Sequence, residues 1–278
     1  MNNVLFAFCV LGGLGVVFGL VLAVASKVFH VEEDPRIAQI QSCLNGANCG
    51  ACGYAGCAGY AEAVVKGEAP LNLCAPGGAE AVAKIAGIMG EEPAEFVRQV
   101  AFVRCSGGEK AYNKYNYDGV KDCALASTAI GGGPRSCAYG CLGYGNCVSV
   151  CQFDAIHIVN GVAKVDHEKC RGCLACVSAC PKRLIVAMPY DAAGAIACNN
   201  TDKGGITRKV CESGCLGCHI CEKNCPHNAV HIIDNLSVKD FSKCQNCGIC
   251  AEKCPRKLIF FPGSPAQVSA EEGKDKAV

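Results

Sequence analysis

The sequence predicts an α+β fold in which one apolar N-terminal helix precedes a small helical domain and a tandem pair of mixed helix-and-strand modules. Three observations predict this organisation: an uncharged apolar run at residues 4–25, 26 cysteines that mostly lie in closely spaced groups, and a cysteine pattern that repeats at a fixed offset of 74 residues. The formal net charge of +1 gives no reason to expect nucleic-acid binding.

The apolar run at residues 4–25 is long enough to cross a bilayer as one helix. No basic residue precedes it, which favours a membrane anchor over a cleaved signal peptide. Lys27 and Arg36 follow it, and positive charge at that end places the rest of the chain on the cytoplasmic side. We therefore predict a single-pass anchor over residues 1–26 in the inner (cytoplasmic) membrane of the cell, a linker over 27–42 and a cytoplasmic body.

The first cysteine group contains Cys49, Cys52 and Cys57, separated mainly by glycine and alanine, and Cys74 follows. Four thiolates can bind a [4Fe–4S] cluster or a closed tetrahedral zinc site. The iron–sulfur runs farther along the chain favour the cluster. We predict a helical [4Fe–4S] domain over residues 43–104.

Residues 105–136 are predicted to form a connecting loop, polar and rich in glycine, that carries Cys105 and Cys123. A loop of this length in a compact domain is either functional or disordered. The two cysteines favour a function.

The run C-x2-C-x2-C-x3-C-P occurs twice in the second half of the repeat, starting at Cys215 and at Cys244. In such a run three thiolates bind one cube, and the fourth crosses over to the cube of the other run. In the first copy, the turn Asn160-Gly161 between two apolar stretches predicts a hairpin. We predict two-cluster ferredoxin-like modules over 137–190 and 211–263, a connector over 191–210 and a disordered tail over 264–278.

Crossed ligation assigns the clusters of the second copy to Cys215, Cys218, Cys221 and Cys254, and to Cys244, Cys247, Cys250 and Cys225. In the first copy, Tyr144 stands where the second copy has Cys218, so one cluster lacks a ligand. Cys137 is the replacement nearest in sequence. We therefore assign the first-copy clusters to Cys137, Cys141, Cys147 and Cys180, and to Cys170, Cys173, Cys176 and Cys151.

Four cysteines of the body then remain besides Cys43, namely Cys105, Cys123, Cys198 and Cys211. We predict that they bind a sixth cluster between the modules, beyond the five already assigned. The alternative is that they are scattered free thiols.

The order of these features resembles the B subunit of the Rnf complex, a membrane-bound ferredoxin:NAD⁺ oxidoreductase, in its clostridial form. The resemblance rests on the N-terminal anchor, the CGACGYAGC group with Cys74, and the ferredoxin-like runs. It implies that the chain accepts electrons from reduced soluble ferredoxin and passes them to the membrane subunits of the complex. It also implies that the complex couples electron flow to NAD⁺ with export of Na⁺ or H⁺. Tyr144 and Gln152, the latter in place of the expected proline, depart from the ligand pattern.

No dinucleotide fingerprint and no nucleophile–base pair suggest an organic-substrate site on this chain, so no catalytic residue is predicted. Three rivals remain: a polyferredoxin subunit of another membrane redox complex, a structural zinc protein and a cluster-delivery scaffold. Basic residues close to the cysteine runs could dock an acidic ferredoxin, although charged loops are more often only solvated.

Overall fold

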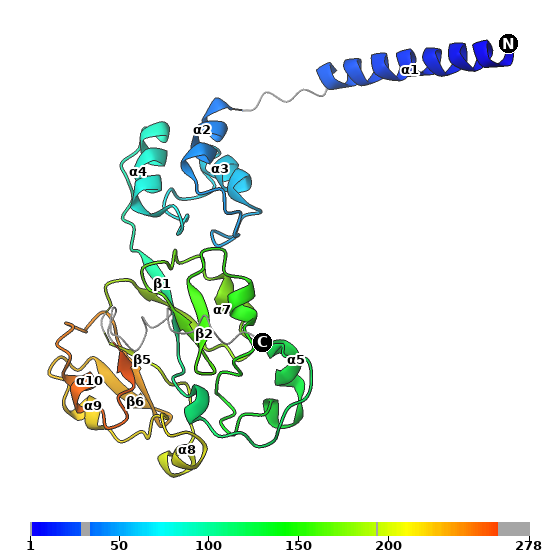
Figure 1. Cartoon of the computed structure of the whole chain (residues 1–278). Coiled ribbons are helices and arrows are strands. Elements are labelled where there is room, and N and C mark those ends of the chain that lie inside the picture. Colours follow the sequence, from blue (N-terminus) through cyan, green and yellow to red (C-terminus); the bar gives the residue numbers. More distant parts are fainter. Residues whose placement is uncertain (1, 29–33, 193, 261–278) are drawn as a thin grey trace.

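The structure is a computed structural model that describes residues 2–28, 34–192 and 194–260. Helix α1 (Asn2–Val28) stands apart from the other elements in Figure 1. Its described apolar side chains are largely exposed, including Phe6, Leu11 and Leu22. By length and hydropathy together, none of the helices in these described ranges qualifies as a membrane span.

A small domain of three helices follows, made of α2 (Pro35–Cys43), α3 (Cys57–Val65) and α4 (Gly78–Met89). Asp34 caps α2 by accepting a hydrogen bond from the Arg36 backbone N–H, and Pro35 occupies the first turn, where its missing donor costs nothing. The three helices enclose Ile40 and Ile85, which are completely buried. The second half of the predicted linker, residues 35–42, therefore belongs to α2.

The first module contains two antiparallel strand pairs. β2 (Ile156–Val159) and β3 (Val162–Val165) form the predicted hairpin, with both turn residues, Asn160 and Gly161, at positive φ. The other pair joins β1 (Gln99–Val103) to β4 (Ile185–Pro189). The segment predicted as the end of the helical domain thus supplies a strand to the first module. The short helices are α6 (Asn146–Ser149) and α7 (Ala175–Ala179).

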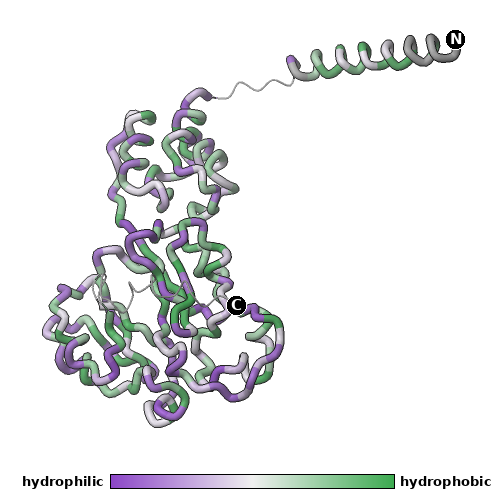
Figure 2. Tube along the Cα trace, viewed as in Figure 1, coloured by the Kyte–Doolittle hydropathy of each residue, from purple (hydrophilic) through white to green (hydrophobic). Residues whose placement is uncertain are grey.

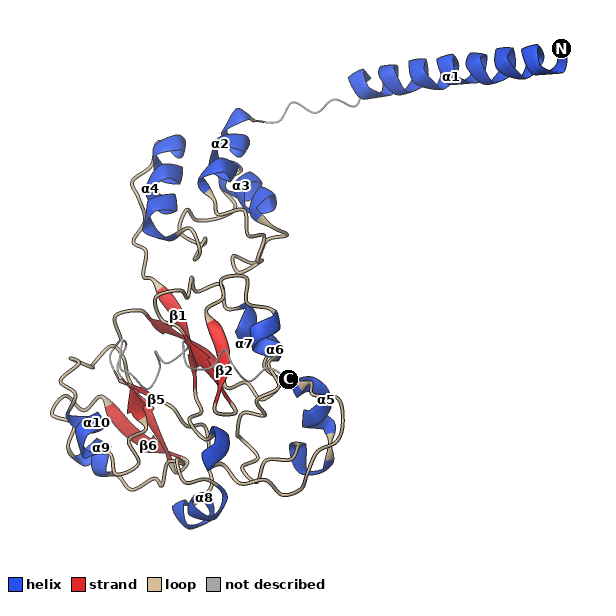
Figure 3. Ribbon diagram, in the orientation of Figure 1, coloured by secondary structure: helices blue, strands red, loops and turns tan. Residues whose placement is uncertain are grey.

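The second module repeats this plan, as Figures 1 and 3 show. β6 (Val230–Ile233) pairs with β7 (Leu236–Lys239), and β5 (Ala195–Ile196) pairs with β8 (Ile259–Phe260). Helices α9 (Ile220–Lys223) and α10 (Ile249–Lys253) carry cysteines of the two runs, and α8 (Gly204–Val210) lies in the segment between the modules. Buried apolar residues form a core in each module, and much of the trace through these cores is coloured hydrophobic in Figure 2. β5, predicted as connector, is therefore the first strand of this module.

Residues 105–136 form an ordered segment that contains η1 (Gly108–Lys110), α5 (Cys123–Thr128) and η2 (Ile130–Gly132). The segment contacts the start of the second module, where the Tyr112 N–H donates to Val210 O at 3.1 Å and the Glu212 N–H donates to Lys110 O at 2.9 Å. The predicted tail at 264–278 lies outside the described residues.

Candidate metal centres

The N-terminal cysteine group lies where α3 begins. Asn48 Oδ1 accepts a hydrogen bond of 2.8 Å from the Cys57 backbone N–H and thereby fixes the first turn of α3. Gly56 has φ +95°, and a Cβ there would stand 2.8 Å from the same oxygen, so only glycine fits. Burial raises the pKa of Cys74, and the nearby thiolates of Cys57, Cys49 and Cys52 raise it further. The four predicted ligands are therefore neighbours in space.

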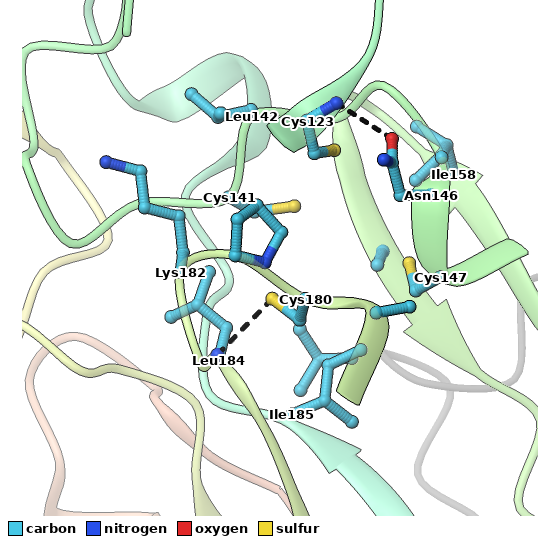
Figure 4. A pocket seen from close by; sticks show the side chains of 15 residues that line it. Cys123, Cys141, Leu142, Asn146, Cys147, Ile158, Cys180, Lys182, Leu184 and Ile185 are labelled. Carbon is cyan, nitrogen blue, oxygen red and sulfur yellow. Dashed lines mark hydrogen bonds between the residues drawn. The ribbon is translucent and has the colours of Figure 1, made fainter. Parts of the chain in front are cut away.

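The first module contains a pocket of about 390 Å³ that four sulfur atoms surround (Figure 4). The sulfur atoms belong to Cys123, Cys141, Cys147 and Cys180. Burial, together with smaller contributions from neighbouring thiolates that include Cys123, raises the pKa of Cys147 to about 12. Val103, Leu142, Ile158, Leu184 and Ile185 complete a mainly apolar wall.

The structure does not bring Cys137 to this pocket, contrary to the grouping predicted from the sequence. Cys123 lies there instead, at the first residue of α5. Asn146 holds it in place: its Oδ1 accepts from the Cys123 N–H at 2.8 Å, and its Nδ2 donates to Asp122 Oδ2 at 2.6 Å. Proximity in sequence was a poor guide because the residue that lies near in space comes from residues 105–136, an inserted segment that is much shorter in the second copy.

One signal in the sequence could have indicated this arrangement. Asn146 stands where the second copy has Ile220, so the first copy replaces an apolar residue by a polar one beside the missing ligand. Tyr144, in the position of the lost cysteine, packs against Tyr117 of the inserted segment with 5.8 Å between ring centroids. Both changes face residues 105–136.

The second cysteine group of the first module keeps its predicted members. Burial, together with smaller contributions from the neighbouring thiolates of Cys170, Cys173 and Cys151, raises the pKa of Cys176 to about 12. Two backbone amides donate to these sulfur atoms, Ala101 N–H to Cys170 Sγ and Ala155 N–H to Cys151 Sγ, both at 3.4 Å.

The second module contains two pockets, each lined by four cysteines in the predicted grouping. One measures about 410 Å³ and the other about 300 Å³, space open to solvent included. In the larger pocket the Cys221 sulfur lies 3.3 Å from the buried Ser237 hydroxyl. The members are Cys215, Cys218, Cys221 and Cys254 in the larger pocket, and Cys225, Cys244, Cys247 and Cys250 in the smaller.

A further pocket, of about 330 Å³, lies where the two modules meet and is also lined by four cysteines. Its members are Cys105, Cys137, Cys198 and Cys211. Three of these four belong to the predicted sixth group. Compared with the predicted assignments, Cys123 and Cys137 have exchanged places.

The chemistry of these pockets suits clusters bound by thiolates. Four thiolates on a [4Fe–4S] cube each bind a different iron, so they stand farther apart than ligands of a single ion. Among the residues that the structure describes, no group of three or more His, Cys, Asp or Glu side chains is arranged to hold one metal ion. The pockets supply four sulfur donors each, apolar walls, and backbone N–H groups directed at sulfur, for example from Leu184 to Cys180 at 3.4 Å.

These sites and the ferredoxin-like modules define an iron–sulfur electron-transfer protein with several clusters. Comparisons with known proteins agree: a model described as "Putative Fe-S cluster" matches residues 44–76, and a 4Fe-4S binding domain matches residues 163–186 and 237–260.

Relatives extend the match over most of the chain. The B subunit of a Na⁺-translocating ferredoxin:NAD⁺ oxidoreductase complex from Acetobacterium woodii is 44% identical over 87% of this chain and 73% of its own length. A proton-translocating counterpart from Clostridium ljungdahlii is 43% identical over 87% of this chain and 86% of its own length. The B subunit of an ion-translocating oxidoreductase complex from Methanosarcina acetivorans is 40% identical over 87% and 93%. The chain belongs to this family, the B subunits of Rnf complexes, as its motifs predicted.

Proposed function

We propose that this chain is the iron–sulfur electron-transfer subunit of an ion-translocating ferredoxin:NAD⁺ oxidoreductase. It accepts electrons from reduced ferredoxin and passes them toward the membrane subunits and ultimately NAD⁺. The observation that carries the proposal is the series of cysteine-lined pockets in a chain of this family. A polyferredoxin of another membrane complex is less well supported, because the three relatives above are all B subunits of ion-translocating oxidoreductase complexes.

The geometry supports five ligand sets. A [4Fe–4S] cluster bound at each would supply a one-electron carrier. Apolar walls exclude water from the sites. Backbone N–H groups donate hydrogen bonds to the cysteine sulfur atoms. The sets are Cys49, Cys52, Cys57 and Cys74; Cys151, Cys170, Cys173 and Cys176; Cys123, Cys141, Cys147 and Cys180; Cys215, Cys218, Cys221 and Cys254; and Cys225, Cys244, Cys247 and Cys250.

The N-terminal set lies beside the first module, which gives the series a continuous path. Burial raises the pKa of Cys173, and the thiolate of Cys49 adds a smaller increase. A Cβ at Gly172 would overlap Gln99 O and would stand 3.8 Å from Ala75 Cβ, one residue from Cys74. Close backbone packing of this kind keeps two ligand sets within reach of each other.

We infer that α1 attaches the subunit to the membrane or to its membrane-embedded partners. The support is the uncharged run at residues 4–25 and the exposure of side chains such as Leu11 and Phe18, which would favour an apolar environment. Lys27 at the end of α1 would then lie on the cytoplasmic side, with the cysteine-rich body.

The experiment is anaerobic purification of the whole complex and measurement of NAD⁺ reduction by reduced ferredoxin. Two electrons and one proton convert one NAD⁺ to NADH, so two one-electron donors should be consumed for each NADH formed. Cys247→Ala removes an exposed thiol of the last pocket and should lower the iron content by about four atoms together with the rate.

The matched control is Cys43→Ala, because Cys43 lines none of the five cysteine sets and its thiol donates to Gln39 O. This variant should keep both the iron content and the rate. If Cys247→Ala reduced NAD⁺ with ferredoxin as fast as the unmodified complex while lacking those irons, the proposed route through this module would be wrong.

A further inference from the structure

The pocket where the modules meet is built from equivalent positions of the two copies. Cys105 lies two residues after β1, and Cys198 lies two residues after β5. Val103 pairs with Ile185, and Ile196 pairs with Ile259. Ile259 is the residue of the second copy that corresponds to Ile185, so the two strands are equivalent. Each module therefore places one cysteine just after its first strand.

The other two ligands of this pocket are also a matched pair. Cys137 and Cys211 occupy the same place in the two copies, each ahead of the first cysteine run. Because the second module completes both of its own pockets without Cys211, Cys137 is equally free to serve another site. Two cysteines from each module thus meet in one pocket.

The hydrogen bonds at this pocket repeat in the same way. The Cys141 N–H points to Cys105 Sγ at 3.5 Å, and its repeat partner, the Cys215 N–H, points to Cys198 Sγ at 3.3 Å. Cys141 and Cys215 each line the neighbouring pocket of their own module. The junction pocket is therefore connected to one ligand set on each side by a single hydrogen bond.

The positions two residues beyond Cys105 and Cys198 reach across to the other module. A Cβ at Gly107 would stand 3.4 Å from Cys211 Sγ and 3.7 Å from Cys105 Sγ, so glycine leaves this space free. The equivalent residue, Asn200, is 1% exposed and its Nδ2 lies 3.7 Å from Cys137 Sγ. Its Oδ1 accepts a 2.7 Å hydrogen bond from the Asp202 N–H, which orients the amide.

We propose that Cys105, Cys137, Cys198 and Cys211 bind a sixth [4Fe–4S] cluster that is the electron relay between the two modules, and that Asn200 tunes it. The inference rests on the proposed function and adds an electron-transfer connection between the two modules. N–H groups directed at thiolates favour the reduced cluster, which carries one more negative charge, and so raise its reduction potential. Arg104, half-buried in the same pocket wall, adds positive charge beside Cys198.

Iron analysis of the intact complex gives the first test. Six clusters require about 24 irons in this subunit, and five require about 20. Cys198→Ala should remove about four irons, whereas Cys43→Ala should remove none. Rapid reduction by ferredoxin in Cys198→Ala should reach the clusters of only one module, with at least a tenfold slower transfer to the other.

A second test keeps the proposal falsifiable if Cys198→Ala fails to fold. Asn200→Leu removes the side-chain donor and keeps a similar volume. In an EPR-monitored redox titration one midpoint should become more negative, with a roughly tenfold lower ratio of reduced to oxidised cluster at fixed potential, equivalent to about 59 mV for one electron. The control is Thr207→Val, because the buried Thr207 hydroxyl donates to Asp202 O and not to a sulfur atom.

The outcomes separate this inference from the proposed function. About 20 irons in a complex that still reduces NAD⁺ with ferredoxin would overturn the sixth cluster alone. Equal midpoints in Asn200→Leu and the unmodified protein would overturn the tuning role of Asn200. About 24 irons without ferredoxin-dependent NAD⁺ reduction would overturn the proposed function and leave the relay site intact. A midpoint that moved equally in Thr207→Val would show that Asn200 has no specific role.

Discussion

The two ferredoxin-like modules share one plan but complete their clusters differently. The second module takes Cys215, Cys218 and Cys221 from one short run, so three of the four cysteines of its pocket come from local sequence. The first module has Tyr144 in the middle position and obtains Cys123 from an inserted segment. A ligand lost from a repeat can thus be replaced from outside the repeat, provided that a hydrogen-bonding residue holds the replacement in place.

The difference also changes what the inserted segment does. Residues 105–136 supply Cys105 to the junction pocket and Cys123 to the pocket of the first module. They also pair with the start of the second module, where Ala111 and Cys211 form a β-bridge. The second module has no counterpart, because only a short stretch separates Cys198 from Cys211. The insertion therefore links cluster assembly in one module to contact with the other.

The largest effect is expected from removing Cys123, the ligand that the first module takes from outside the repeat. Cys123→Ala should remove about four irons and lower ferredoxin-dependent NAD⁺ reduction by more than about 100-fold, beyond the usual cost of losing an outer partner of a metal ligand. Adding Tyr144→Cys restores the pattern of the second module and should recover most of the iron. Iron analysis and activity of the single and double variants measure this. If Cys123→Ala kept its full iron content, Cys137 would again be assigned as the fourth ligand of this cluster.

A smaller loss is expected from the residue that positions Cys123. Asn146→Ile introduces the side chain found in the second module and removes both hydrogen bonds to the α5 terminus. Cluster affinity should fall by about 10–100-fold, the usual effect of losing an orienting partner. Bleaching of the visible absorption by a chelator should be faster, while Ile220→Val in the second module serves as control. A bleaching rate equal to that of the unmodified protein would show that Asn146 has no positioning role.

The modules should also differ in reduction potential. Ser237 contacts Cys221 Sγ in the second module, and the first module has Ala163 at that position. Ser237→Ala should make the potential of the second-module cluster more negative, by less than a tenfold change in the redox ratio, or about 59 mV. Ala163→Ser should shift the first-module cluster in the opposite direction. An EPR-monitored titration that found both midpoints unchanged would exclude the hydroxyl as the cause of a difference.

The smallest effect is expected from the turn after the fourth cysteine. Pro226 follows Cys225 in the second module, whereas the exposed Gln152 follows Cys151 in the first. Gln152→Pro should stabilise the first module by about 0.4–1 kcal/mol, because proline restricts the unfolded chain. The midpoint of thermal bleaching should rise slightly, and Pro226→Gln should lower it. Destabilisation by Gln152→Pro would mean that the local backbone differs between the modules.

The parts of the fold that lie within the sequence repeat could be predicted from the sequence. The hairpin at Asn160-Gly161 follows from local turn chemistry, and the structure confirms it. Strand β1 was assigned to the helical domain because its partner, β4, lies far away in sequence. The first and last strands of each module meet only through long-range pairing, which no local pattern reports.

The sites show the same limit. Runs of cysteines two residues apart specify their own pockets, and those of the second module appear in the predicted groups. Isolated cysteines carry no such information, because Cys137 lies much nearer than Cys123 to Cys141 in sequence and yet Cys123 is the residue that lines the pocket. Equivalence between Cys105 and Cys198 was the missing clue, and it becomes visible only once β1 and β5 are known to be the same strand.

Strand β1 acts as a spacer between three of the ligand sets. It begins at Gln99 beside Ala75 and Gly172, donates from Ala101 N–H to Cys170 Sγ, and ends just before Cys105. An extended strand rises about 3.3 Å per residue and cannot stretch, so its length fixes how far apart three ligand sets stand. Inserting two residues would keep every side chain on its own face and still push the sets apart by about 7 Å. The length of β1 therefore sets the distances between these ligand sets.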